Sequence, residues 1–286
     1  MIEQLCTEQK MEYGGRQSGL NCCVVTPCYN SGMYLEAMLD SVHNQQGVDI
    51  IHIVFDGAST DNSVSILKKW EDSHDNICLV SKKDEGQADA LNQALALVST
   101  RYFGWLNADD LYLDGCLNAL LLAANGHFNE HGAYPAIVYG DYNVIDERGV
   151  VIACRPQPTF NRWDCLNGYL GVQNSAALFN TELLRQAGGF DKKWHFVMDY
   201  DVILKLSARG SVIHIPRYCG SFRLHSTSKT SVLNDVCQKE TRQLRSQNGV
   251  SSIPWIANLT HKLALARVSC RMAREGCLRA RFKHCS

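Results

Sequence analysis

The stretch Ile53-Val54-Phe55-Asp56-Gly57-Ala58-Ser59-Thr60-Asp61 joins an apolar, β-branched run to a loop rich in side-chain oxygens. Three further polar segments follow apolar runs in a similar way: residues 26–30 (TPCYN), 84–89 (DEGQAD) and 107–110 (NADD). Ligands of an open α/β sheet bind outside the carboxyl ends of the strands, so these segments are expected to share one crevice. Carboxylates gathered without matching basic residues indicate a divalent cation there, and hence a phosphorylated ligand.

Apolar runs and amphipathic segments alternate around this stretch. Buried strands are predicted over residues 21–26, 50–55, 77–80 and 102–106. Helices are predicted to begin near Ser31 and near Asp61, and a third over residues 87–98, because each carries apolar residues at helical spacing. Strands and helices that alternate at this spacing predict an α/β fold with a mostly parallel central sheet flanked by helices.

After residue 114 the alternation of predicted strands and helices becomes less regular. Helices are predicted over residues 115–124, 181–187 and 198–208, and strands over 136–139, 150–153, 172–179 and 212–215. The expected organisation is a polar tail (1–20), one compact domain (21–230) and a helical, basic C-terminal extension (231–286).

Composition bounds the function. The chain has 286 residues, of which 45% are hydrophobic and 20% charged, and its net charge is −1. This balance argues against nucleic acid as a partner. The 13 cysteines lack the spacing of a zinc site, and no secretion signal or bilayer-spanning run stands out. We therefore expect free thiols and a cytoplasmic protein.

Six motifs in order resemble those of the family 2 glycosyltransferases, over roughly residues 22–230. They are Thr26-Pro27-Cys28-Tyr29-Asn30, Asp56-Gly57-Ala58-Ser59-Thr60-Asp61, the stretch from Asp84 to Asn92, Leu106-Asn107-Ala108-Asp109-Asp110, Phe196-Val197-Met198-Asp199-Tyr200-Asp201 and Phe222-Arg223-Leu224-His225. The resemblance implies a GT-A fold with a Rossmann-like nucleotide-binding half. Two positions depart from the family pattern: Asn107 stands where the first Asp of the metal-binding Asp-x-Asp motif is usual, and Met198 where many relatives have Glu.

The function that this resemblance implies is transfer of a sugar from a nucleotide diphosphate sugar to a hydroxyl, with inversion and with Mn²⁺ or Mg²⁺ as cofactor. A UDP-sugar is the favoured donor and guanosine donors stay open. The expected acceptor is a glycan or a lipid-linked sugar, in polysaccharide or glycoconjugate biosynthesis. The alternatives are a non-catalytic nucleotide- or glycan-binding relative and a sugar nucleotidyltransferase. The second lacks support because residues 27–32 are not a glycine-rich basic loop.

The resemblance assigns five residues to the nucleotide: Thr26, Pro27, Tyr29, Asp56 and Asp84. Asp56 ends a predicted strand, so its carboxylate would accept a hydrogen bond from the N–H of a uracil ring. The alternative is that Asp56 only satisfies the following turn. Asp84 would contact ribose or sugar hydroxyls, or would cap the helix that begins near residue 87.

Five more residues are assigned to the sugar, the acceptor and the metal. Asp89, Asn107 and Asp110 are placed at the sugar or acceptor, with helix capping or turn formation as the alternatives for the two aspartates. Asp109 is the predicted metal ligand because hard cations prefer carboxylate oxygen. His225 is a second metal-side candidate, with Arg223 and Lys229 adding positive charge beside phosphate; otherwise it is an exposed loop histidine.

Asp199 is the predicted catalytic base. An inverting transfer needs one carboxylate that takes the proton of the acceptor hydroxyl. Asp199 opens an apolar helical segment, where the helix dipole favours the ionised carboxylate. The alternative is an Asp that only stabilises the start of a helix.

The C-terminal segment 255–281 mixes apolar and basic residues at helical spacing. A basic amphipathic helix binds anionic membrane surfaces, which predicts a peripheral enzyme at the cytoplasmic face. The alternative is a helix packed on the catalytic domain.

Overall fold

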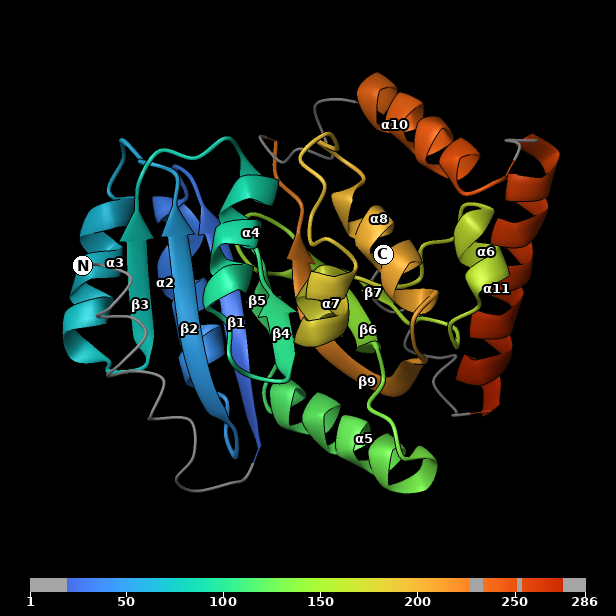
Figure 1. Cartoon of the computed structure of the whole chain (residues 1–286), viewed down its shortest axis with the longest axis horizontal. Helices are drawn as coiled ribbons and strands as arrows, with labels where there is room; N and C mark the ends of the chain where they lie inside the picture. The colour runs from blue at the N-terminus through green and yellow to red at the C-terminus, as the bar shows by residue number, and fades with distance from the viewer. Residues whose placement is uncertain (1–19, 227–233, 251–253, 275–286) are drawn as a thin grey trace.

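The structure, a computed structural model, describes residues 20–226, 234–250 and 254–274. Within these residues one nine-stranded sheet runs through the molecule with helices on both faces (Figure 1). The strand order is β3-β2-β1-β4-β8-β6-β9-β5, and β7 pairs with β6 beside this path.

The first half of the sheet is parallel, as predicted. Its strands are β1 (Asn21–Cys28), β2 (Asp49–Asp56), β3 (Ile77–Ser81) and β4 (Tyr102–Trp105). The crossovers contain α2 (Gly32–His43), α3 (Ser63–Ser73) and α4 (Gln87–Leu97). Parallel pairing puts the ends of β1, β2 and β4 at one edge, where the predicted nucleotide residues lie.

The second half of the sheet is mixed, which the prediction of a mostly parallel sheet does not describe. Its strands are β5 (Leu111–Tyr112), β6 (Ile137–Ile145), β7 (Val151–Arg155), β8 (Ala177–Asn180) and β9 (Val212–Arg223). β8 is antiparallel to both β4 and β6, whereas β6 and β9 are parallel.

Strand β9 is longer than the predicted strand 212–215. Pro216 has no N–H to donate, so the sequence pattern ends there. The ladder resumes because the register between β6 and β9 shifts after Tyr139, and Asp141 pairs with Tyr218. The added residues carry Arg223 and His225 to the edge where Asp109 lies.

Two apolar clusters cover the two faces of the sheet. One contains residues of α4, of α7 (Thr181–Gln186) and of α8 (Met198–Ser207); the other contains residues of α2, α3 and α5 (Cys116–His131). The short helices α6 (Arg162–Leu166) and η2 (Asn174–Ala176) were not predicted; η2 occupies part of the predicted strand 172–179.

The C-terminal extension packs against the end of the molecule opposite β3 (Figure 1). Its described part contains α10 (Asn234–Gln247) and α11 (Pro254–Arg274). Leu244 of α10 belongs to the core cluster of α8, and Ala264 and Val268 of α11 are buried.

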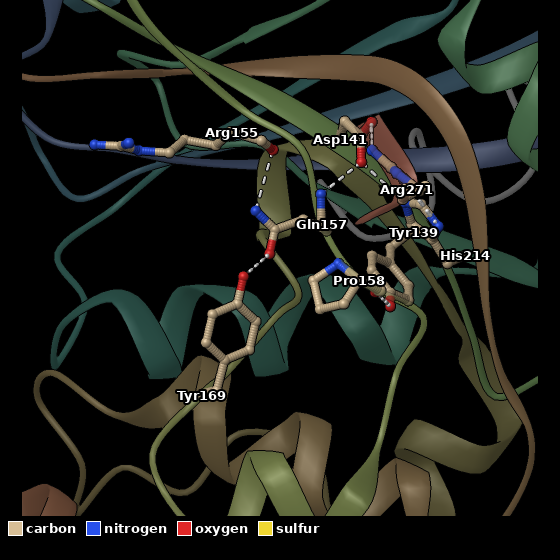
Figure 2. Close-up of polar contacts among 8 residues, drawn as sticks. All are labelled: Tyr139, Asp141, Arg155, Gln157, Pro158, Tyr169, His214 and Arg271. Atoms are coloured by element: carbon tan, nitrogen blue, oxygen red, sulfur yellow. Dashed lines mark hydrogen bonds and ion pairs between the residues drawn. The ribbon is translucent and has the colours of Figure 1, made fainter. Parts of the chain in front are cut away.

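Two arginines of α11 form ion pairs with buried carboxylates of the domain. Arg271 lies 2.6 Å from Asp141, whose other oxygen accepts from the Gln157 N–H at 2.7 Å and lies 2.9 Å from His214 Nε2 (Figure 2). Arg267 pairs with Asp164 of α6. The helix is therefore anchored to the domain, which is the packed alternative considered for this segment.

In the described ranges no helix has the length and apolar character to cross a membrane. Nine cysteines there carry free thiols, as expected. Cys78 is disulfide-bonded, so the expectation of free thiols was wrong for this residue.

Candidate active site

The predicted site residues lie along one edge of the sheet. The first turns of α4 and α8 begin at the edge toward which β1, β2 and β3 point, and β9 ends there as well (Figure 1). Asp84 precedes α4, and Asp89 lies in the first turn of that helix. Asp199 lies in the first turn of α8, and His225 follows β9. The topology thus brings together segments that are far apart in the sequence.

The Asp56 carboxylate is buried and accepts three hydrogen bonds from two serines, one of them from the Ser59 hydroxyl to Oδ1. It accepts the Ser59 N–H at 3.1 Å and the Ser81 hydroxyl at 2.7 Å. The turn-forming alternative for Asp56 is therefore realised, and contact with a base remains a prediction that needs a free lone pair. The loop after Asp56 is locked in place because Asn30 Oδ1 accepts the Thr60 N–H at 2.8 Å.

This pair of loops stores backbone strain. Asn30 has φ 48° and Ala58 has φ 62°, a left-handed conformation that side chains with a Cβ rarely adopt. In the described ranges no other non-glycine residue does so. Strain of this kind is concentrated at functional sites, where the surrounding contacts hold it in place.

The first motif divides between the interior and the surface. The Thr26 side chain is buried, with Oγ1 3.0 Å from His52 Nε2, so only its backbone is left for the nucleotide. Pro27 is half-buried. Tyr29 is 64% exposed beside the Asp56 loop and is accessible to a stacking base.

Asp84 lies against this loop. Its Oδ1 accepts the Gly86 N–H at 2.9 Å, so part of the carboxylate caps the turn before α4. A Cβ added to Gly57 would come within 2.9 Å of Asp84 Oδ2, which explains glycine at that position. The second and third predicted motifs are therefore neighbours in space.

Asp89 links α4 to the loop that precedes α8. Its Oδ1 forms a 2.5 Å ion pair with Lys192, and Oδ2 accepts from Gln93 and from the Glu85 N–H. The hydrogen bond from Lys192 holds the pKa of Asp89 below its usual range. These contacts give Asp89 a structural role, and its assignment to the sugar stays a prediction.

Asn107 and Asp110 act as a scaffold for the loop that contains Asp109. Asn107 Oδ1 accepts from Gln87 Nε2 at 2.7 Å and from Trp105 Nε1 at 2.9 Å, so two donors occupy its lone pairs. Its amide nitrogen donates to Asp110 Oδ2 at 3.2 Å. Asp110 is fully buried and accepts the Arg223 N–H at 2.9 Å. Direct contact of either residue with a sugar or acceptor has no support in this arrangement.

Asp109 and His225 meet at the open side of the same loop. Asp109 Oδ2 lies 2.9 Å from His225 Nε2, and the Asp109 side chain is 27% exposed. The Tyr34 ring, 5.1 Å from the His225 ring between centroids, backs the pair. An octahedral ion with ligands at about 2.1 Å places neighbouring ligands about 3 Å apart, so this oxygen and nitrogen fit two adjacent positions.

The Arg223 guanidinium contacts backbone carbonyls and an aromatic ring. It donates to the backbone oxygens of Asp109 and Asp146, at 2.8 and 3.0 Å, and lies over the Tyr34 ring. Backbone carbonyls engage Nε and one terminal nitrogen of the guanidinium, and the positive charge that Arg223 was expected to add beside phosphate stays a prediction. Lys229 lies outside the described residues.

Asp199 stands in the first turn of α8, half-buried. Burial raises its pKa to about 6, although the Tyr200 N–H donates to Oδ1 at 2.7 Å. Desolvation thus outweighs the helix terminus in setting the pKa, although a carboxyl with a pKa of about 6 is still mostly ionised at neutral pH, as expected. A carboxyl with a pKa near 6 suits a general base that works at neutral pH.

Sequence reasoning gave no role to four residues that build the site. Tyr34 backs His225, Gln87 and Trp105 orient Asn107, and Glu147 lies near Tyr34, whose pKa it helps to raise. Gln87 lies in a quoted motif, but nothing in the local pattern pairs it with Asn107.

Comparison with known proteins agrees with this geometry. The sequence model of the family described as "Glycosyl transferase family 2" matches residues 23–170. The chondroitin synthase of Pasteurella multocida is 27% identical over 217 residues, which is 76% of this chain and 22% of that protein. The hyaluronan synthase of the same species is 26% identical with the same coverage. The chain therefore spans about a fifth of the length of these relatives.

Solved structures share the fold. TarS 1–349 of S. aureus in complex with UDP-GlcNAc has a TM-score of 0.62 at 16% identity, covering 87% of this chain and 72% of that one. The mannosyltransferase PcManGT of Pyrobaculum calidifontis, in complex with GDP-Man and Mn²⁺, has a TM-score of 0.57 at 17% identity, covering 97% and 83%. These are GT-A glycosyltransferases, and the predicted GT-A fold is confirmed.

Proposed function

Because this chain belongs to glycosyl transferase family 2, we propose that it transfers a sugar from a nucleotide diphosphate sugar to an acceptor hydroxyl with inversion. The observation that carries the proposal is the convergence of Asp109 and His225, 116 residues apart, at 2.9 Å on the sheet edge where α8 presents Asp199. A UDP-sugar is the first donor to test, since TarS is described with UDP-GlcNAc. The GDP-Man complex of PcManGT keeps guanosine donors as the alternative.

Asp109 and His225 are the residues that would hold a divalent cation. No group of three or more His, Cys, Asp or Glu suited to a metal occurs in the described part of the chain, so the donor diphosphate and water would supply the remaining ligands. Bound there, Mn²⁺ or Mg²⁺ neutralises the charge that develops on the leaving diphosphate. Asn107 and Asp110 act indirectly, because they hold the loop that presents Asp109.

Asp199 performs the proton transfer. Its carboxylate takes the proton of the acceptor hydroxyl, whose oxygen forms the new bond to the anomeric carbon. The bond from that carbon to the diphosphate oxygen breaks, and the diphosphate leaves with the electron pair. Tyr29 and the Asp56 loop would bind the nucleoside, and Asp84 the ribose or the sugar. The retained Asp109 and Asp199 favour this enzyme over a non-catalytic binding relative.

The acceptor is proposed from the relatives. Chondroitin and hyaluronan synthases make polysaccharides, so we place the acceptor among glycans or lipid-linked sugars. A cytoplasmic location, free or peripheral at the membrane, belongs to the same proposal.

Calorimetry of UDP with and without Mn²⁺, followed by a transfer assay with labelled nucleotide sugars, tests the proposal. Affinity should rise with Mn²⁺ and lose this dependence in Asp109→Asn. Asp199→Asn should bind UDP normally but turn over roughly 10² to 10⁴ times more slowly, the range for a lost general base. Equal UDP affinity with and without the metal would refute the metal site. Normal turnover of Asp199→Asn would refute the base.

A further inference from the structure

A carboxylate from the C-terminal extension reaches the loop in front of the predicted base. Glu240 of α10 is buried, and its Oε2 accepts the Phe196 N–H at 2.9 Å. The His195 N–H donates to both carboxylate oxygens, at 3.1 and 3.2 Å. These two residues immediately precede Val197, the residue that caps α8, and Asp199 stands two positions later.

The chemistry of this contact is unusual for a buried carboxylate. No ion pair joins Glu240 to a basic side chain in the described ranges. A buried charge without such a partner is costly unless hydrogen bonds compensate for the lost water. Charge-assisted bonds from backbone N–H groups supply that compensation, so the two amides and the carboxylate fix one another.

Glu240 is itself held rigidly. Leu244, one helical turn further along α10, lies in the core cluster of α8. Arg245 Nε donates to the backbone oxygen of Leu166 at 2.8 Å, and Tyr200 of α8 bonds the neighbouring Cys165 oxygen. Helices α10 and α8 therefore contact the same core cluster and the same short helix, α6. These contacts fix Glu240 relative to the loop that it binds.

At its other end the same loop is tied to α4. Lys192 pairs with Asp89, and the Phe190 N–H donates to Asn92 Oδ1 at 2.9 Å. The segment 190–197 thus spans from α4, which bears Asp89, to α8, which bears Asp199. Glu240 holds the two residues that precede the N-cap position of α8.

We propose that Glu240 is a positioning residue, which fixes the 195–197 loop so that Asp199 meets the acceptor hydroxyl. The proposal rests on the proposed function, because it assumes Asp199 as the base. A catalytic group displaced by about 1 Å can cost 10²-fold in rate. Loss of Glu240 is therefore expected to lower kcat. Donor binding should stay intact, because the loop positions Asp199, which acts on the acceptor hydroxyl in the proposed mechanism.

Two substitutions of Glu240 distinguish the effect of its hydrogen bonds to the loop from the effects of its side-chain volume and its negative charge. Glu240→Ala removes every acceptor. Glu240→Gln, with its amide oxygen at the Oε2 position, keeps one bond to each N–H group and loses the second bond from the His195 N–H to Oε1. Asp235→Ala, an exposed position on the same helix, is the matched control. The readouts are kcat, donor KM, thermal unfolding, and hydrogen exchange of the peptide that contains His195 and Phe196.

Glu240→Ala should lower kcat roughly 10- to 100-fold with donor KM within about twofold, and should speed exchange of the 195–196 amides. Glu240→Gln should recover kcat to within about threefold of the parent enzyme and restore slow exchange. Asp235→Ala should behave as the parent.

Three results would overturn the inference. One is normal kcat in Glu240→Ala; another is equal loss of kcat in the Ala and Gln variants. The third is a loss of activity that only follows global unfolding, with unchanged exchange at 195–196 in the folded protein. Asp199→Asn, assayed beside them, tells the two proposals apart: if that variant is active the base itself is wrong, whereas an inactive Asp199→Asn with an unaffected Glu240→Ala refutes only the positioning role.

Discussion

Two aspartates near the sheet edge, Asp110 and Asp199, have pKa values that burial raises, yet they differ in what surrounds them. For Asp110 the neighbouring charge of Asp109 adds to the effect, and the carboxyl is enclosed by Asn107 and the Arg223 backbone. Asp199 accepts a single bond from the Tyr200 amide and is half-buried. Only Asp199 combines a raised pKa with lone pairs left for an acceptor hydroxyl.

With Asp199 as the proposed base, the pH dependence of turnover is expected to follow its pKa of about 6. Below that pH the carboxyl is protonated and cannot take the acceptor proton, so kcat should fall about tenfold per pH unit on the acid side. Initial rates at saturating donor and acceptor from pH 4.5 to 8 measure the acid limb. The residual activity of Asp199→Asn should lack this limb. A limb of the same midpoint in that variant would assign the titration to another group.

Asn107 offers a test of whether the usual acidic residue would serve as a ligand here. Asn107→Asp would place a carboxylate oxygen 3.2 Å from buried Asp110 and would lose the donated hydrogen bond. We expect a loss of about 1–3 kcal/mol in the free energy of unfolding and a lower unfolding midpoint by roughly 3 to 10 °C. The exposed Gln46→Glu substitution is the control. Tighter Mn²⁺ binding by a stable Asn107→Asp protein would show that residue 107 is a ligand.

At the residue scale, the sequence identified residues that lie together in the structure, but it did not reveal the contacts that determine what each of them does. Asp109 and His225 were both assigned to the metal side, from two separate motifs, and the structure places their side chains 2.9 Å apart. Asn107 and Asp110 were assigned to a sugar because local motifs do not reveal side-chain partners. Gln87 lies 20 residues from Asn107, and the amide that engages Asp110 belongs to Arg223, 113 residues away.

Among the elements, the parallel half of the sheet was predictable because each strand is a buried apolar run and each crossover an amphipathic helix. Strand β8 was predicted as a strand, but its antiparallel direction depends on pairing with β4 and β6. Two-residue β5 and five-residue α6 carry too few residues for a periodic signal. The extension of β9 past Pro216 depends on a register shift that only its partner strand allows.

Packing between α2, β2 and α3 encloses two neutral histidines. His43 Nε2 lies 3.3 Å from His52 Nδ1, and the His43 ring also faces Trp70 and His74. Burial lowers the pKa of His43 to about 4, with a smaller effect from His74, and lowers that of His52 as well. Neither ring hydrogen-bonds to a carboxylate of the described residues, so acid should weaken this contact between elements.

The sign follows from proton linkage. The unfolded chain protonates His43 near pH 6.5 and the folded protein only near 4, so stability falls as the pH drops between these values. His43 alone should account for roughly 2 kcal/mol after allowance for its partial exposure. Urea unfolding at pH 7.5 and 4.5 should show a smaller difference for His43→Phe, which keeps an aromatic ring. An equal difference in both proteins would contradict the linkage.

On the scale of the whole molecule, α11 has two faces with different uses. Arg267 and Arg271 are committed to Asp164 and Asp141, so they contribute little to a membrane surface. Leu259 and Leu263 are 46% and 47% exposed, and Lys262 is exposed beside them. If the enzyme is peripheral, this outer face carries the contact.

Co-sedimentation with anionic vesicles checks that membrane proposal. Lys262→Glu should weaken binding at least about fivefold, since each basic residue near the surface contributes about 1 kcal/mol. Leu263→Asp should weaken it too, whereas Leu122→Asp, an exposed position on α5, should not. Point variants are preferable to truncation because removing α11 would leave two buried carboxylates without their arginines. A parent protein that stays in the supernatant at low salt refutes membrane binding.

The ion pair between Asp141 and Arg271 can form only after the ribosome has synthesised both residues. The two residues are 130 positions apart, and ribosomes add about 5–20 residues per second. Strand β6 therefore leaves the peptidyl-transferase centre roughly 7 to 26 seconds before the arginine that balances its buried carboxylate exists. During that interval the parallel half of the sheet has been synthesised and α11 is not yet complete, so the Asp141 carboxylate lacks the arginine that pairs with it in the folded protein.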